Sequence, residues 1–171
     1  MRDSSPFRIH VSDLLGDSGR RRTVAIDAPI EWPLELSVVG PRLHADLVLQ
    51  GAAGGVLVGG AIETEATHSC HRCLTDWTEP IRVEISELLG LDEDPDGYPL
   101  DGEVADLEVP IRDAVLLAIP INPTCRPDCL GICATCGGDL NTGSCPGHDE
   151  GQDSPFAPLR ELFDSIRLEG S

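Results

Sequence analysis

The sequence contains no lysine, so all twelve of its basic residues are arginine. Aromatic residues make up only 4% of the chain, and a core must therefore be built mainly from Val, Leu, Ile and Ala. No apolar run is long enough to span a bilayer. The segment from Met1 to Arg8 is polar and leads into no apolar signal core. These absences predict a cytoplasmic protein that makes no membrane contact.

The short motifs of several enzyme classes are missing as well. The sequence has no HExxH metalloprotease motif, no phosphate-binding loop with a Gly-Lys pair and no nucleophile elbow. His10, His44 and His68 are scattered along the chain, and we interpret them as surface residues. We therefore expect a protein that is not an enzyme and that has no small-molecule substrate.

Positive charge is scarce, and the formal net charge is −18. Phosphate backbones attract basic side chains, so bare RNA should repel a chain this acidic. The only basic run, Arg20 to Arg22, is too short for an RNA-binding face. An acidic protein more naturally binds a basic one, and ribosomal proteins are a large basic class. The alternative that the charge only maintains solubility stays open.

A strong β pattern occupies the first two-thirds of the chain. Apolar and polar residues alternate there, as they do in half-buried strands. The pattern predicts an α+β, mostly β fold with an antiparallel twisted sheet or partial barrel. Strands are expected at residues 7–15, 43–49, 56–65 and 81–85, with an apolar run at 34–39 and a polar loop at 17–22.

Two short helices are expected in the last third of the chain. Residues 109–119 have Pro110 in the first turn, and Ile111 and Val115 fall on one face. Residues 155–168 carry a second apolar stripe at helical spacing, behind a plausible N-cap at Ser154. This second helix is predicted to pack on the domain or on a partner.

Acidic residues cluster before the first of these helices. Residues 84–108 include ten acidic side chains and no basic one, so a mobile acidic loop is expected near residues 92–103. The predicted organisation is a β-rich domain at 1–120, a Cys-rich segment at 121–150 and a C-terminal helix at 151–171.

The seven cysteines are the strongest chemical signal. An odd number of thiols in a protein expected in the reducing cytosol favours metal binding over disulfides. A two-residue gap lets one tight turn present two thiolates to one metal, as in Cys70-x2-Cys73. The second cluster reads Cys133-x2-Cys136-x8-Cys145-x2-His148, which is a specific zinc pattern.

Seven cysteines and one histidine are enough ligands for two four-coordinate sites. The predicted ligands are Cys70, Cys73, Cys125 and Cys129 for one zinc ion, and Cys133, Cys136, Cys145 and His148 for the other. A single site that uses Cys133, Cys136, Cys145 and either Cys129 or His148 is the alternative. Zinc would be structural in both cases, because a closed Cys-rich tetrahedron leaves no position for water or substrate.

A thiol redox role for Cys70 and Cys73 is a further alternative. His71 and Arg72 between them would lower a thiol pKa. A thioredoxin-like motif should open a helix, however, and residues 75–80 lead towards a strand instead. A structural zinc module unrelated to ribosomes also stays open.

Three ordered segments carry a resemblance to a known family. Residues 70–74 read CHRCL, residues 113–123 read DAVLLAIPINP, and residues 131–141 read GICATCGGDLN. Together they resemble the bacterial large ribosomal RNA subunit accumulation proteins, the YceD family. Residues 154–162 (SPFAPLREL) are similar to the short C-terminal helix of that family.

The resemblance implies a zinc-binding accessory factor in biogenesis of the large ribosomal subunit, which supports the synthesis, processing or stability of 23S rRNA. It names no catalytic residue. The family's gene often neighbours that of a small ribosomal protein, which implies a ribosomal protein or a pre-50S particle as partner. Direct RNA contact through a zinc knuckle is the alternative.

Overall fold

The computed structural model describes residues 5–90 and 97–148. The chain divides into two compact units, residues 1–127 and residues 128–171. All the named strands and the helix belong to the first unit. The helix predicted at 155–168 lies outside the described residues, as does the segment 91–96 of the predicted acidic loop.

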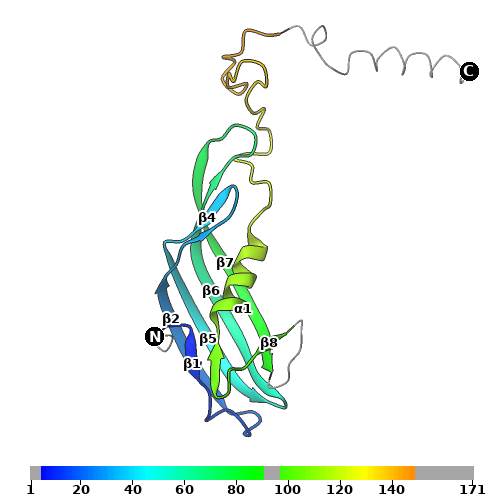
Figure 1. Cartoon of the computed structure of the whole chain (residues 1–171). Coiled ribbons are helices and arrows are strands. Elements are labelled where there is room, and N and C mark those ends of the chain that lie inside the picture. Colours follow the sequence, from blue (N-terminus) through cyan, green and yellow to red (C-terminus); the bar gives the residue numbers. More distant parts are fainter. Residues whose placement is uncertain (1–4, 91–96, 149–171) are drawn as a thin grey trace, which may run out of the picture. The chain divides into compact units, whose positions relative to one another are not determined.

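Three long antiparallel strands form the centre of the sheet: β5 (Arg42–Ala52), β6 (Gly55–Ser69) and β7 (Asp76–Gly90). A two-residue turn joins β5 to β6, since Ala52 pairs with Gly55. Residues on β5 alternate strictly: Leu47 is fully buried, whereas its neighbour Asp46 is exposed. The sheet curls into half a barrel, which Figure 1 shows in the first unit.

The other strands extend this sheet or cover it. β2 (Arg21–Pro29) pairs with β5 along its whole length and borders the sheet (Figure 1). At the far end of β6, β4 (Ser37–Val39) pairs with it and in turn pairs with β3 (Trp32–Pro33). β8 (Tyr98–Pro99) runs parallel to the end of β7, and β1 (Arg8–His10) pairs with β9 (Val104–Asp106) in a separate small sheet.

One helix, α1 (Glu108–Ala118), lies over a face of the sheet (Figure 1) and packs against β7. Ile111 and Val115 are four residues apart, so they share the helix face that is buried. Their side chains join inward-facing strand residues such as Leu47 and Ile62 in one hydrophobic core. The buried residues of this core are aliphatic apart from Phe7, as the low aromatic content predicts.

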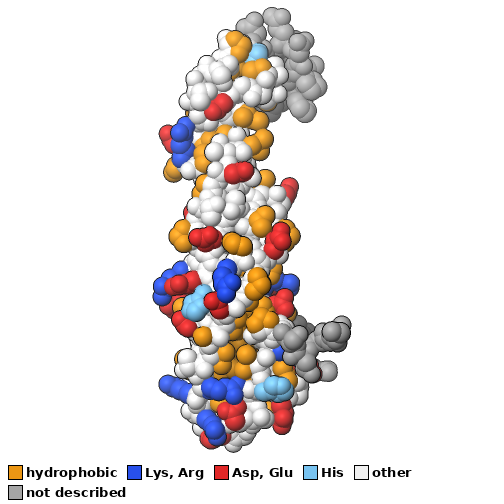
Figure 2. Space-filling view, turned by 90° about the vertical axis from the view of Figure 1, so that its left-hand side faces the viewer, with side chains coloured by type: hydrophobic (Ala, Val, Ile, Leu, Met, Phe, Trp, Pro, Cys, Tyr) orange, Lys and Arg blue, Asp and Glu red, His pale blue; other side chains and the backbone are white. Residues whose placement is uncertain are grey.

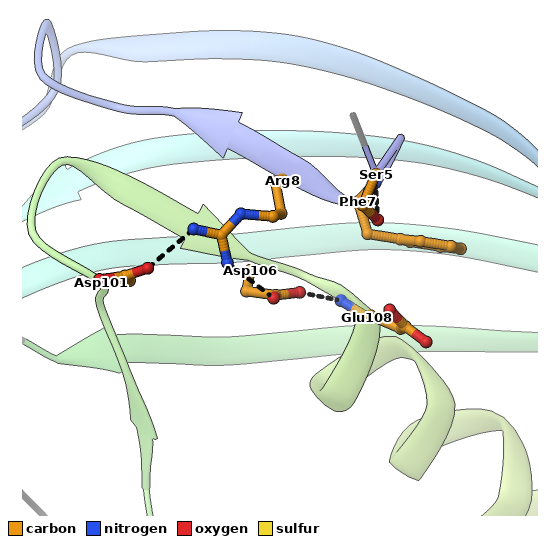
Figure 3. Close-up of polar contacts among 6 residues, drawn as sticks. All are labelled: Ser5, Phe7, Arg8, Asp101, Asp106 and Glu108. Carbon is orange, nitrogen blue, oxygen red and sulfur yellow. Dashed lines mark hydrogen bonds and ion pairs between the residues drawn. The ribbon is translucent and has the colours of Figure 1, made fainter. Parts of the chain in front are cut away.

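Arg8 ties the small sheet to the start of α1. Its Nη2 lies 2.7 Å from Oδ2 of Asp101, and its Nη1 lies 3.3 Å from Oδ2 of Asp106 (Figure 3). The other carboxylate oxygen of Asp106 accepts a hydrogen bond from the backbone N–H of Glu108 at 3.1 Å. An acidic side chain at this place satisfies one of the N–H groups that a helix start leaves without a partner.

The predicted fold class is confirmed, because the described part of the chain is mostly β, with one helix and a curled antiparallel sheet. The strands expected at 43–49, 56–65 and 81–85 correspond to β5, β6 and β7, and the helix expected at 109–119 corresponds to α1. Within the described ranges, no helix has the length and apolar character needed to cross a membrane.

The N-terminal predictions were partly wrong. The strand expected at 7–15 ends at His10, because the chain turns there and buries Val11 and Leu14 in the core. The loop expected at 17–22 overlaps the start of β2 at Arg21, and β2 itself was not predicted. Of the residues near 92–103 that the structure describes, Tyr98 and Pro99 form β8.

His68 is not the surface residue that we expected, because its place on β6 turns the side chain inwards and buries it fully. Its Nδ1 lies 2.7 Å from Oγ of Ser37. Its Nε2 makes no hydrogen bond but lies 3.2 Å from Oε1 of Glu79. The ring also contacts Trp77, with ring centroids 5.1 Å apart. The contact with Ser37 offsets part of the cost of burying a polar ring.

Candidate metal centres

The predicted ligands come together in two groups of four. In each group, the potential ligand atoms all lie within 4.8 Å of one another. The first group is Cys70, Cys73, Cys125 and Cys129, and the second is Cys133, Cys136, Cys145 and His148. All seven cysteines lie in the described part of the chain, and none forms a disulfide. Each group can hold a metal ion.

The first pair of thiols lies on a tight turn between β6 and β7. The backbone N–H of Cys70 donates to the carbonyl of Thr75 at 3.0 Å, and the N–H of Leu74 donates back to the carbonyl of Cys70 at 2.9 Å. The N–H of Arg72 donates to Sγ of Cys70 at 3.4 Å. This turn presents the thiols of Cys70 and Cys73 on the same side, as one metal requires.

The turn at Cys133 in the second unit repeats this hydrogen-bond pattern. The N–H of Cys133 donates to the carbonyl of Gly138 at 2.8 Å, and the N–H of Gly137 donates to the carbonyl of Cys133 at 2.8 Å. Gly137 and Leu74 hold the same place in the two turns, with φ of 71° and 61°. Both are left-handed conformations, which suit glycine and are rare for leucine.

Cys125 reaches the first turn from a segment far along the chain. The N–H of His71 donates to the carbonyl of Pro123 at 2.9 Å, and Nδ1 of His71 lies 3.0 Å from the same oxygen. Nδ1 is also 3.2 Å from Oγ1 of Thr124. These contacts hold Cys125 with its Sγ 3.6 Å from that of Cys73, across 52 residues of sequence. Sequence reasoning missed this positioning role of His71.

Asn141 organises the loop of the second unit. Its side-chain oxygen accepts from the N–H of Leu130 at 2.8 Å, and its amide nitrogen donates to Oδ1 of Asp139 at 2.8 Å. The same nitrogen lies 3.7 Å from Sγ of Cys129. The signal for this role was the DLN tripeptide at 139–141, which we used only as part of a resemblance. The last pair in this unit, Cys136 and Cys145, has its sulfur atoms 3.8 Å apart.

The turns also change the acidity of their thiols. Burial by itself raises the pKa of Cys70, but hydrogen bonds from the backbone at Cys125, Cys73 and Arg72 lower it to about 5. Backbone hydrogen bonds at Cys136 and Thr135 lower the pKa of Cys133 to about 6. Metals bind the thiolate, so the first cysteine of each turn is prepared as a ligand at neutral pH.

The pKa values of two other thiols, Cys73 and Cys145, are shifted in opposite directions. A hydrogen bond to Thr75 lowers the pKa of Cys73. For Cys145, a backbone hydrogen bond from Gly147 acts to lower the pKa, but burial and the neighbouring thiols of Cys133 and Cys136 outweigh it and the pKa is raised. Burial disfavours the charged thiolate of Cys145, and the neighbouring sulfur atoms disfavour a further negative charge beside them.

Comparisons with known proteins agree with this cysteine pattern. A family model described as "Large ribosomal RNA subunit accumulation protein YceD" matches residues 58–163. A maize protein named "Large ribosomal RNA subunit accumulation protein YCED homolog 1, chloroplastic" is 29% identical over 149 residues, which cover 64% of this chain and 50% of the maize protein.

Mycobacterial proteins are more similar. An uncharacterized protein of Mycobacterium tuberculosis is 37% identical over 150 residues, which cover 81% of this chain and 71% of that protein. A Mycobacterium leprae protein is 34% identical over 142 residues, or 76% of this chain and 64% of its own. No solved structure matches.

Proposed function

Because the chain belongs to the YceD family of large ribosomal RNA subunit accumulation proteins, we propose that it is a zinc-binding accessory factor, not an enzyme, in biogenesis of the large ribosomal subunit. The family supports a role in accumulation of large-subunit rRNA. In this proposal the protein supports the synthesis, processing or stability of 23S rRNA in the cytoplasm. The observation that carries it is the presence of two four-ligand groups in a member of this family.

The chemistry of the two groups supports zinc as the metal. The sulfur atoms of a tetrahedral site with Zn–S bonds of about 2.3 Å lie about 3.8 Å apart. The distances of 3.6 Å between Cys73 and Cys125 and of 3.8 Å between Cys136 and Cys145 match this spacing. A disulfide would need about 2.05 Å. Four protein ligands leave no open position on the metal, so zinc would stabilise each turn rather than activate water.

The charge of the chain supports a basic partner. A net charge of −18 favours association with a positively charged protein and disfavours bare phosphate backbone. We therefore propose that the chain binds a ribosomal protein, alone or on a pre-50S particle. The link to the large subunit comes from the family, and the choice of protein over RNA comes from the charge.

Metal content tests the zinc sites. Protein purified without added metal should contain two zinc ions per chain, and Cys73→Ser and Cys136→Ser should each lose one. His148→Ala should weaken the second site, whereas His44→Ala, a matched change on the sheet surface, should retain both ions. Protein without zinc would contradict the proposal, and a single zinc lost only in Cys136→Ser would support the one-site alternative.

Depletion of the protein in its own cells tests the ribosomal role. The ratio of 23S to 16S rRNA should fall, and the wild-type chain should restore it better than Cys73→Ser. Purified ribosomal proteins should then compete for the chain more strongly than free RNA does. An unchanged rRNA ratio would favour a zinc module unrelated to ribosomes.

One observation favours the alternative of a thiol redox protein. The pKa of Cys70 is lowered to about 5, as it is in redox-active thiols. The Cys70 side chain is fully buried, however, and a redox thiol must be reached by its substrate. Rapid alkylation of Cys70 or Cys73 in the zinc-loaded protein would favour the redox function, and protection from alkylation would favour the structural one.

A further inference from the structure

The strand β2 has an edge that no other described strand covers. Among the strands that the structure describes, β5 is the only partner of β2, along all nine residues from Arg21 to Pro29. Alternate backbone N–H and C=O groups of an antiparallel strand face away from its partner. The edge therefore presents unpaired hydrogen-bonding groups, which natural proteins usually protect.

Nothing in the middle of β2 blocks pairing with another strand. Residues Thr23 to Ile26 include no charged side chain and no proline, and proline occurs only at the end, at Pro29. Figure 2 faces the side of the first unit on which β2 lies in Figure 1, and hydrophobic side chains are exposed there between charged ones. Such an edge is suited to adding a strand.

The charges on β2 are arranged so that the strand complements itself. Arg21 and Asp27 both point to the exposed face, three residues before and three residues after Val24. If two β2 strands pair antiparallel about a two-fold axis at Val24, Arg21 of each lies opposite Asp27 of the other. Opposite charges across a strand pair are stabilising, and like charges are destabilising.

Other registers of two paired β2 strands do not place Arg21 opposite Asp27. Paired residues must lie on the same face if the core face and the exposed face of each sheet are to continue into the other. An axis at Thr23 would place Arg21 opposite Ala25. An axis at Ala25 would place Arg21 opposite Pro29, which has no N–H to donate.

We propose that the free edge of β2 binds β2 of a second copy of this chain, antiparallel and with Val24 on the two-fold axis. The seven residues Arg21 to Asp27 of each copy then form one ladder, and the two half-barrel sheets continue into each other. This contact goes beyond the metal centres and the ribosomal role, and it does not depend on either.

The groups that carry the contact are available. Arg21 is exposed, and its Nε donates to Oε1 of Gln50 at 2.8 Å. The side chain of Asp27 is 52% exposed, and its Oδ1 lies 2.5 Å from Nε of Arg42. A guanidinium has five N–H donors and a carboxylate has four acceptor sites, so each group can keep its present partner and gain one across the axis.

The net charge of the whole chain limits the affinity of this contact between two copies. Each copy carries −18, so two copies repel each other at long range. A single ladder is also a small interface, of the kind that gives weak and reversible association. We therefore expect a monomer–dimer equilibrium that shifts with protein concentration in the micromolar range.

Charge-reversal variants test the register directly. Sedimentation of the zinc-loaded full chain over a concentration series should show mass rising towards twice that of the monomer. Arg21→Asp and Asp27→Arg should each be monomeric. An equimolar mixture of the two should dimerise, because each chain then presents like charges to itself and opposite charges to the other.

Matched variants control for net charge and folding. Arg82→Asp and Glu63→Arg make the same charge changes on the same face, on β7 and β6, and should dimerise like the wild type. Far-ultraviolet circular dichroism should show that all variants are folded. A monomeric wild type at every concentration, a single variant that dimerises normally, or a mixture that stays monomeric would overturn the proposal.

Discussion

Leu74 holds a backbone conformation that leucine rarely adopts. Its φ of 61° lies in the left-handed region, where the equivalent residue of the second cysteine turn is Gly137. For a residue with a Cβ atom this conformation costs roughly 1–2 kcal/mol. The turn nevertheless forms, because the pair of backbone hydrogen bonds between Cys70, Leu74 and Thr75 requires it.

Glycine at position 74 should therefore stabilise the first turn. The Leu74 side chain is 61% exposed, so its removal forfeits little packing. We expect Leu74→Gly to raise the free energy of unfolding by about 1 kcal/mol, because lost strain exceeds the added entropy of the unfolded chain. Denaturant unfolding of the zinc-loaded protein measures this.

Leu88→Gly provides the control for this prediction. Leu88 is an exposed leucine on β7, in an ordinary strand conformation, and its replacement should instead destabilise the protein by roughly 0.5–1 kcal/mol. A loss of stability in Leu74→Gly as well would mean that the leucine side chain contributes more than its backbone costs.

At the scale of elements, β6 contains two adjacent glycines, and only Gly60 is required by the close approach of β5. β5 passes so close to Gly60 that an added Cβ would lie 2.1 Å from the carbonyl oxygen of Asp46. Gly60 also has a φ of 151°, which side chains with a Cβ rarely adopt. Gly59 has neither constraint, since the nearest atom to its Cβ would be the oxygen of Ile85 at 3.6 Å.

This difference predicts that an alanine is tolerated at position 59 but not at position 60. Gly60→Ala should destabilise the protein by about 2 kcal/mol or more, because the β5–β6 backbone must move to relieve the contact. Gly59→Ala should change stability by less than about 0.5 kcal/mol. Thermal unfolding of the two variants measures the contrast, and equal melting temperatures would show that β5 and β6 separate at Gly60 without cost.

At the scale of the whole molecule, the two units depend on different forces. The first unit has a continuous aliphatic core beneath its sheet. In the described part of the second unit, residues 128–148, regular pairing is limited to one isolated bridge between Ile132 and Asp139. A segment with so little core would need a bound metal to fold stably.

Chelation should therefore affect the units unequally. Removal of metal should abolish hydrogen-exchange protection at residues 128–148 and loosen the turn at 70–75. Amides of β5 and the central part of β6 should keep their protection, because apolar burial holds them. Hydrogen exchange followed by mass spectrometry, with and without chelator, measures both regions. Equal loss in both would mean that the sheet also requires metal.

The sequence by itself determined the features that depend on local spacing. Alternation at period two predicts β5, and apolar residues four apart predict the buried face of α1. The two-residue gaps in Cys70–Cys73 and Cys133–Cys136 predict turns that present paired thiols. These patterns act within a few residues, so they can be recognised without knowing the rest of the fold.

The features that depend on contacts between residues far apart in sequence were decided only by the tertiary structure. It brings Cys125 to the first turn across 52 residues, through His71 and Pro123. It buries His68, pairs β2 with β5 and forces Leu74 into a left-handed conformation. Each of these follows from packing and hydrogen bonds between segments far apart in sequence, and no local pattern of residue types encodes which segments will meet.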